Sequence, residues 1–153
     1  MAEIADARYS FIHNTLFGPT RYEGEYRGGC REGLWRVTNE LTGAPMWETT
    51  WRNGVWHGPA TGWWANGNLR DQGEYREGLN HGHWRFWFED GTLAAEGRYE
   101  AGKKVGAWNY WDEAGNPMSY DDWAEQYEQW DWAYDDLTGF PHGSNWPEPP
   151  THP

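Results

Sequence analysis

Two histidine pairs are the first candidates for metal or acid–base chemistry. His81 and His83 stand two residues apart, as two ligands on one side of an extended strand would. No nearby acidic residue has a diagnostic spacing, however, and Gly82 between them is expected in a turn. His57 and His81 each stand directly before a glycine, at equivalent positions of a sequence repeat that is described below, and this favours a turn-stabilising role. We therefore predict no metal site.

Paired carboxylates occur at Asp121-Asp122 and at Asp135-Asp136. A general acid and base act from a cleft that perturbs their pKa values, and a solvated acidic segment does not supply one. The glycines lack the Lys-Ser or Lys-Thr pair that ends a phosphate-binding loop. These patterns predict no catalytic residue, no cofactor and a protein that is not an enzyme.

Glycines and aromatic residues instead recur in the frame Gly-x-Tyr-x-x-Gly-x-x-x-Gly-x-Trp. The third glycine of this frame marks the period and occurs at Gly33, Gly58, Gly82 and Gly106. The steps between copies are thus 25, 24 and 24 residues. A fixed period in this range indicates an array in which each unit buries its apolar face against its neighbours.

Each unit is expected to form two short antiparallel strands. Segments such as 84–88 are rich in aromatic residues that favour a pleated, half-buried surface. The Asn-Gly and Asp-Gly pairs within 65–67 and 89–91 predict tight hairpin turns. The Gly-x-x-x-Gly stretch 78–82 is expected to supply the second turn of its unit. The predicted fold is an all-β repeat array, a single-layer antiparallel meander of about four 24-residue hairpin repeats over residues 22–118.

The glycine that opens the frame, Gly73 or Gly97, falls within a predicted strand. A missing side chain there usually marks close approach by a neighbour, and we place it under a repeat-mate's aromatic ring. The first copy departs from the frame at Cys30 and Leu34 and the second at Thr49 and Ala60, and we expect distortion in these units.

This frame resembles the MORN repeat, and more closely its bacterial variant form, in which Gly-x-Trp replaces the commoner Gly-x-Gly. The segment 22–26 is similar to the opening of a MORN unit, and 56–58 and 80–82 are similar to its His-Gly turn. The resemblance covers roughly residues 22–118. It implies a non-catalytic scaffold or interaction module, and bacterial relatives of this kind are described as antitoxin-like.

The composition indicates a folded chain with an aromatic core. Mean hydropathy is −1.05 and 20 of the 153 residues are glycine, but 14 Trp, 9 Tyr and 5 Phe argue against disorder. A single-layer sheet cannot hide both faces, so we expect Trp64, Trp87 and Trp111 to be partly exposed. These rings suggest an alternative function, the stacking of a sugar or a nucleotide.

Charge is concentrated at one end of the chain. Residues 1–104 hold all 12 Lys and Arg against 14 acidic residues, whereas residues 105–153 hold 10 acidic residues and no Lys or Arg. Such a pole repels phosphate backbones and anionic lipids, so we expect no direct nucleic-acid or membrane binding. The start has no basic, apolar leader, and no run reaches membrane-spanning length, so a cytoplasmic location is expected.

An acidic capping helix is predicted over residues 119–139. Ser119 and Asp122 form a capping box and Gly139 offers a stop. Apolar residues recur on one side of this helix, at Trp123, Tyr127, Trp130, Tyr134 and Leu137. This stripe is expected to cover the last strands of the array.

The opposite side of the helix is the candidate partner surface. It comprises Trp132 and the acidic residues Asp121, Glu125, Glu128, Asp135 and Asp136. An aromatic residue ringed by carboxylates fits a Lys- or Arg-bearing surface. The alternative is that Trp132 packs on the tail or on a second copy while the carboxylates only solvate the helix.

The ends carry less information. Residues 1–21 are expected to form an N-terminal arm or a half-repeat, and residues 140–153 a Pro-rich tail without fixed structure. The leading functional hypothesis is an inhibitor of antitoxin, immunity or phage anti-defence type. Its partner would be a basic protein such as a toxin, a nuclease or a defence effector. A homodimer through the free edge or face of the sheet is a second assembly left open.

Overall fold

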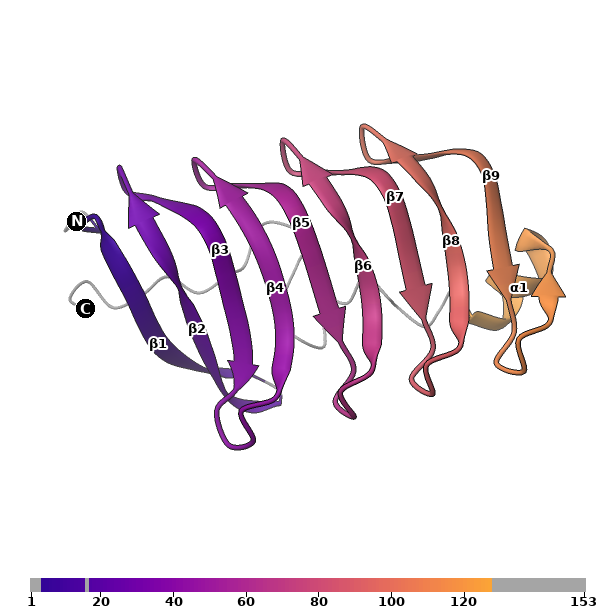
Figure 1. The fold of residues 1–153 in the computed structure, drawn as a ribbon, viewed down its shortest axis with the longest axis horizontal. Helices are drawn as coiled ribbons and strands as arrows, with labels where there is room; N and C mark the ends of the chain where they lie inside the picture. The colour runs from indigo at the N-terminus through magenta and orange to yellow at the C-terminus, as the bar shows by residue number, and fades with distance from the viewer. Residues whose placement is uncertain (1–3, 16, 128–153) are drawn as a thin grey trace.

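The computed structural model describes residues 4–15 and 17–127. These residues form one open antiparallel sheet whose ten strands lie in sequence order, followed by one helix (Figure 1). The strands are β1 (Ala7–Thr15), β2 (Gly18–Arg27), β3 (Cys30–Asn39), β4 (Pro45–Arg52), β5 (Val55–Trp63), β6 (Leu69–Arg76), β7 (Leu79–Trp87), β8 (Leu93–Glu100), β9 (Lys103–Trp111) and β10 (Pro117–Met118). The helix is α1 (Tyr120–Tyr127). The predicted single-layer repeat meander with a C-terminal helix is confirmed.

The array begins earlier in the chain than residue 22. Strand β1 pairs with β2 along its whole length, from Ala7 opposite Tyr26 to Thr15 opposite Gly18. Residues 1–21 are expected from the sequence to form either an arm or a half-repeat. Within this range, Ala7–Thr15 form a strand of the sheet and not an arm.

Two kinds of turn join the strands. The loops at 65–67 and 89–91 connect β5 to β6 and β7 to β8, as their Asn-Gly and Asp-Gly pairs predict. The connections after β2, β4, β6 and β8 are two-residue turns such as Glu77-Gly78, where both residues have positive φ, 51° and 82°. Such turns match the twist of a hairpin.

The prediction that 78–82 forms one turn is wrong at Gly82. Gly82 lies inside β7 with a φ of 68°, where the pairing of β6 with β7 is irregular. Its positive φ belongs to a β-bulge, which left-handed backbone at a glycine permits. Sequence alone does not separate a bulge glycine from a turn glycine, because both need the same backbone conformation.

The opening glycine of the frame lies directly under a tryptophan ring. A Cβ added to Gly73 would lie 2.2 Å from Cδ2 of Trp84, and the indole N–H of Trp84 donates to the carbonyl oxygen of Glu74 at 3.0 Å. The same pair of contacts recurs in the first copy, with Gly24 and Trp35, and in the fourth, with Gly97 and Trp108. The ring thus comes from the tryptophan of the glycine's own frame, and the pair explains why the two residues recur together.

The second copy has both partners of this pair replaced. Thr49 stands where the glycine would be and Ala60 where the tryptophan would be, and the two are directly paired between β4 and β5. The small Ala60 leaves the space that the Thr49 side chain occupies, and both are buried. The strands keep their places in the sheet, so the expected distortion of this unit does not occur.

Trp47 fills the second copy from a different position. It is paired with Gly62, where an added Cβ would lie 2.4 Å from the Trp47 ring. This unit therefore places a large ring over a glycine at a different pair of positions from the other copies.

The two faces of the sheet differ. Aromatic rings stack along one face, which we call the inner face, with successive contacts such as Tyr75 to Trp84 at 5.1 Å and Tyr99 to Trp108 at 5.0 Å between centroids. Intervening residues, such as Arg85 on β7, form the outer face and carry most of the charges. The core therefore consists of aromatic rings on one side of the sheet, as the aromatic composition predicts.

Helix α1 covers the C-terminal end of the inner face. Its backbone begins at a cap in which Ser119 Oγ accepts from the Asp122 N–H at 3.2 Å and donates to Asp122 Oδ2 at 2.8 Å. Trp123 contacts Tyr110 of β9 at 5.1 Å, and Tyr127 contacts Phe88 at 5.0 Å. The predicted cap and the first two residues of the apolar stripe are confirmed, and the stripe from Trp130 onward and the predicted stop lie outside the described residues.

Candidate binding surfaces

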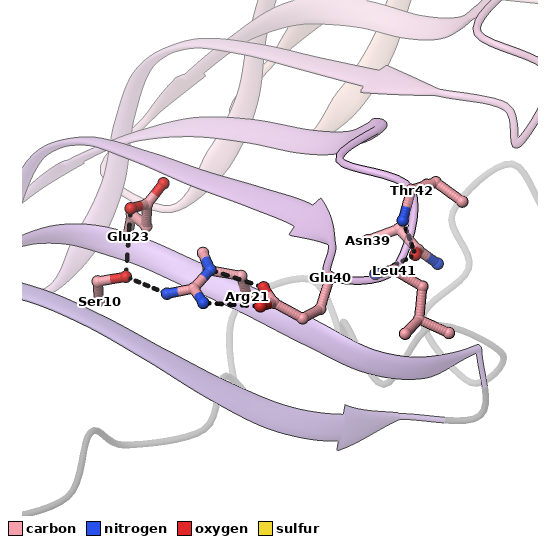
Figure 2. A network of polar contacts seen from close by, with 7 residues as sticks. All are labelled: Ser10, Arg21, Glu23, Asn39, Glu40, Leu41 and Thr42. Carbon is pink, nitrogen blue, oxygen red and sulfur yellow. Dashed lines mark hydrogen bonds and ion pairs between the residues drawn. The ribbon is translucent and has the colours of Figure 1, made fainter.

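Acidic residues on the first strands are neutralised by neighbouring arginines. Figure 2 shows Arg21 of β2 donating from Nε and Nη2 to the two carboxylate oxygens of Glu40 at 2.6 and 2.8 Å. Its third nitrogen, Nη1, donates to Ser10 of β1 at 2.7 Å, and Ser10 in turn donates to Glu23 at 3.2 Å. The hydrogen bond to Arg21 lowers the pKa of Glu40. This network ties the first strands together across the outer face.

The same balance continues along the outer face. Arg36 contacts Glu48 and Arg85 contacts Glu96, each at 3.1 Å, and the two arginines occupy equivalent positions two repeats apart. Each pair joins an odd strand to the following even strand. The middle of the outer face is thus close to neutral locally, although it is rich in charges.

The C-terminal end of the array has no such balance. Residues 105–127 contain Asp112, Glu113, Asp121, Asp122 and Glu125 but no Lys or Arg. Backbone and side-chain hydrogen bonds from Asn116 in its turn lower the pKa of Asp112, so this carboxyl stays ionised at neutral pH. The described part of the chain places these acidic residues on the last turn and on α1, beyond the ion-paired strands.

Only part of the predicted partner surface lies within the described residues. Asp121 and Glu125 are exposed on α1, whose buried side is formed by Trp123 and Tyr127. The remaining members lie outside the described residues, namely Trp132, Glu128, Asp135 and Asp136. Asp121 and Glu125 are four residues apart and hence neighbours on one side of the helix.

The three tryptophans expected to be exposed are half-buried, but they do not form one set. Trp87 and Trp111 end β7 and β9, and the equivalent residue of β5 is Trp63, which is also half-buried. Trp64 follows one residue later and its indole N–H donates to the carbonyl oxygen of Trp87 at 3.0 Å. Trp64 therefore fixes the backbone of Trp87, while Trp63 takes the repeat position.

Cations on the inner face were not foreseen from the sequence. Arg31 is buried over the rings of Trp35 and Trp51, at 5.1 and 5.2 Å from the centroids. Lys104 has the same offset in the fourth copy and lies 4.9 Å from the Trp108 centroid. A basic residue two positions after the turn glycine was the available signal, and only the packed rings show its role as a cation–π partner.

Asp71 is the one charged carboxyl buried in the described part of the sheet. Its Oδ2 accepts from Arg70 Nε at 2.9 Å, and Arg70 lies over the Trp47 ring at 5.1 Å. Burial raises the pKa of Asp71, and the charge of Arg70 partly opposes that rise. The acid stands on the inner face at the repeat position where the other copies have the buried Tyr22, Trp47 and Ala95, so the repeat register was the available signal of its burial.

The histidines do not converge on a common point. His57 Nδ1 accepts from the backbone N–H of Glu77 at 3.2 Å, which supports the turn of the next repeat. His81 faces Glu74 and His83 faces Glu96, at 4.0 and 3.8 Å. Within residues 4–15 and 17–127, no group of three or more His, Cys, Asp or Glu is placed to hold a metal ion. No helix in the same stretches is long and apolar enough to cross a membrane.

The fold and its surfaces define a β-hairpin repeat array, a class of protein that generally serves as a non-enzymatic binding module. Residues 56–77 and 80–101 match the MORN repeat variant family. The two matched segments cover the β5–β6 and β7–β8 hairpins, which confirms the resemblance for two repeats of the array. No curated protein matches the chain in sequence.

Proposed function

We propose that this protein is an interaction module that inhibits a basic protein partner by binding it with its acidic C-terminal end. The observation that carries the proposal is the segregation of charge. Upstream carboxylates such as Glu40, Glu48 and Glu96 are paired with arginines. Asp121 and Glu125 instead face solvent on α1 and form no ion pair among the described residues, where Lys104 lies over the ring of the neighbouring Tyr120. Exposed charge of one sign attracts a partner of the opposite sign and accelerates encounter.

The rest of the fold supports this role by holding the acidic end in place. Trp123 and Tyr127 anchor α1 to the rings of the last strands, so the helix presents its acidic side from a fixed platform. Carboxylates held in one orientation lose less conformational freedom on binding than carboxylates on a mobile chain. The proposal extends to an antitoxin, an immunity protein or a phage inhibitor of a defence factor, each of which would block a basic toxin, nuclease or effector.

A binding panel tests the proposal. Purified basic nucleases and nucleic-acid-binding effectors are passed over the immobilised full-length protein at low and at high salt. We expect at least one to be retained at low salt and released at high salt, because screening weakens attraction between exposed charges. Failure to retain any member at low salt, or retention that salt does not affect, would contradict the proposal.

A matched pair of variants then locates the surface. Glu125→Gln removes one exposed carboxylate from α1, and Glu100→Gln removes one exposed carboxylate from the end of β8. Both change the net charge by the same amount, so a general charge effect would weaken binding equally. We expect the α1 variant to bind the retained partner several-fold more weakly and the β8 variant to bind it unchanged.

A further inference from the structure

Three half-buried tryptophans recur at one position of the repeat on the outer face. They are Trp63, Trp87 and Trp111, the last residues of β5, β7 and β9, and we call them the tryptophan row. Alternation along each strand assigns the face, because Phe86 and Tyr110, one residue earlier, pack on the inner face. The row therefore crosses the sheet perpendicular to the strands, on the face opposite the aromatic core.

The intervening strands complete the row with aliphatic residues. Trp63 is paired with Leu69, Trp87 with Leu93 and Trp111 with Pro117. Leu69 and Leu93 are half-buried. The result is an apolar strip, one pair on each hairpin, on a face that otherwise carries ion pairs. In the first repeat the equivalent residue is Thr38, so the strip starts at β5.

The indole N–H groups of the row are available to a ligand. The indole N–H of Trp63, Trp87 or Trp111 has no acceptor among the described residues, and none of the three N–H groups is fully buried. The contrast is with Trp84 on the inner face, whose indole N–H donates to a backbone carbonyl at 3.0 Å. A half-exposed indole presents both an apolar ring and a hydrogen-bond donor to an incoming chain.

The spacing of the row selects the shape of that ligand. Neighbouring strands lie about 4.8 Å apart, so tryptophans on every second strand recur at about 9.6 Å. A polyproline II helix rises about 3.1 Å per residue with three residues per turn, so equivalent residues recur at about 9.3 Å. Over the two intervals of the row the mismatch is about 0.6 Å, small enough for flexible side chains to absorb.

The charge beside the row selects the flanking residues of the ligand. The turns that follow Trp87 and Trp111 carry Glu89, Asp90 and Glu113, all exposed, and they contain no Lys or Arg. Hydrogen bonds from Thr92 lower the pKa of Asp90, so this carboxyl is ionised at neutral pH. On the other side of the row Arg85 is already paired with Glu96. A cationic chain thus fits the turn side of the row.

We propose that the tryptophan row binds a proline-rich segment of a partner protein in the polyproline II conformation, with prolines at every third position and Lys or Arg between them. Each proline of the register packs on one indole, and each indole N–H donates to a backbone carbonyl of the ligand. Those carbonyls are free because polyproline II has no internal hydrogen bonds. The surface is separate from the acidic side of α1 and does not depend on it.

The test uses the full-length protein and a fluorescein-labelled peptide with proline at every third position and lysine at the others. Its control is a peptide of the same composition in which the proline spacing is scrambled. We expect anisotropy to report saturable binding of the first peptide and much weaker binding of the second. Equal binding of both peptides, or no binding of either, would overturn the proposal.

Variants tie the binding to the row. Trp87→Ser and Trp111→Ser are each expected to weaken peptide binding about tenfold, in the range of one aromatic contact with a hydrogen bond. Trp87→Phe loses the donor but keeps an aromatic ring, although a smaller one, so its loss of binding should be smaller than that of Trp87→Ser. Leu41→Ser, which alters a residue 79% exposed in the β3–β4 loop, is the control and should bind as the unaltered protein does.

Further measurements separate this proposal from its competitors. Circular dichroism and thermal unfolding confirm that each serine variant is folded, and the phenylalanine variant keeps the test decisive if one is not. Glu125→Gln should leave peptide binding unchanged, so the two proposals can fail independently. Row-dependent binding of neutral oligosaccharides or nucleotides with no binding of the peptide would also overturn the proposal.

Discussion

The pairing of Gly73 with Trp84 gives the sharpest prediction about stability. A Cβ at position 73 would lie 2.2 Å from the indole, whereas non-bonded carbons pack at about 3.5–4.0 Å. The ring cannot withdraw easily, because Trp84 is 2% exposed and its N–H is bonded to the Glu74 carbonyl. We therefore expect Gly73→Ala to lower the free energy of unfolding by about 3 kcal/mol, the upper end of the cost of overpacking.

The second copy supplies the compensating change. Because Thr49 and Ala60 occupy the equivalent positions there, Gly73→Thr combined with Trp84→Ala rebuilds a pair that the sheet already contains. Trp84→Ala alone should cost about 3–5 kcal/mol through the cavity it leaves. The double variant should be more stable than the sum of the two single changes predicts by about 1–3 kcal/mol.

Urea unfolding followed by circular dichroism measures each free energy. Gly106→Ala is the control, since a Cβ there meets no atom within 4 Å and only its φ of 68° opposes the substitution. That backbone cost is about 1–2 kcal/mol. Strict additivity of Gly73→Thr and Trp84→Ala, or a Gly73→Ala variant as stable as the unaltered protein, would refute the explanation of the frame.

Three further predictions concern buried groups. Thr49 Oγ1 is buried and has no hydrogen-bond partner among the described residues, so Thr49→Val should leave the free energy of unfolding unchanged or raise it by up to about 1 kcal/mol. A fall of more than about 1 kcal/mol in urea unfolding would contradict this. The pKa of Asp71 is higher in the folded protein than its usual value of 3.8. Protonation of Asp71 therefore stabilises the fold; this stabilisation is fully present below pH 3.8 and is lost as the pH rises through the folded-state pKa. Lowering the pH from neutral should therefore stabilise the unaltered protein more than the Asp71→Asn variant. If the difference between the urea midpoints of the two proteins does not change with pH, the prediction is wrong. Trp123→Ala should detach α1 from the sheet and lower the free energy of unfolding by about 3–5 kcal/mol. The detached helix should be cleaved faster by a protease at Tyr127, and an unchanged rate of cleavage would refute the capping role.

The repeat frame and its strands and turns could be predicted from the sequence, because they depend on residues close together in the chain. Residue types that favour positive φ predict turns, aromatic runs predict strands, and together they predict hairpins. Because the period is constant, each hairpin packs against neighbours of the same kind. The cap at Ser119 and Asp122 was visible for the same reason, since its hydrogen bonds join residues three positions apart. Gly82 shows the limit of local rules, because a bulge and a turn demand the same backbone angle.

The tertiary structure decided what depends on contacts between strands. Only the paired strands show that Thr49 and Ala60 compensate for each other, and only the faces of the sheet distinguish Trp63 from Trp64. The burial of Arg31 likewise follows from the Trp35 and Trp51 rings beside it, and that of Asp71 from its place on the inner face between β5 and β7. The sequence by itself therefore determined an aromatic hairpin array with an acidic end, while the pleat and the strand register decided which residues of that array meet one another and which face solvent.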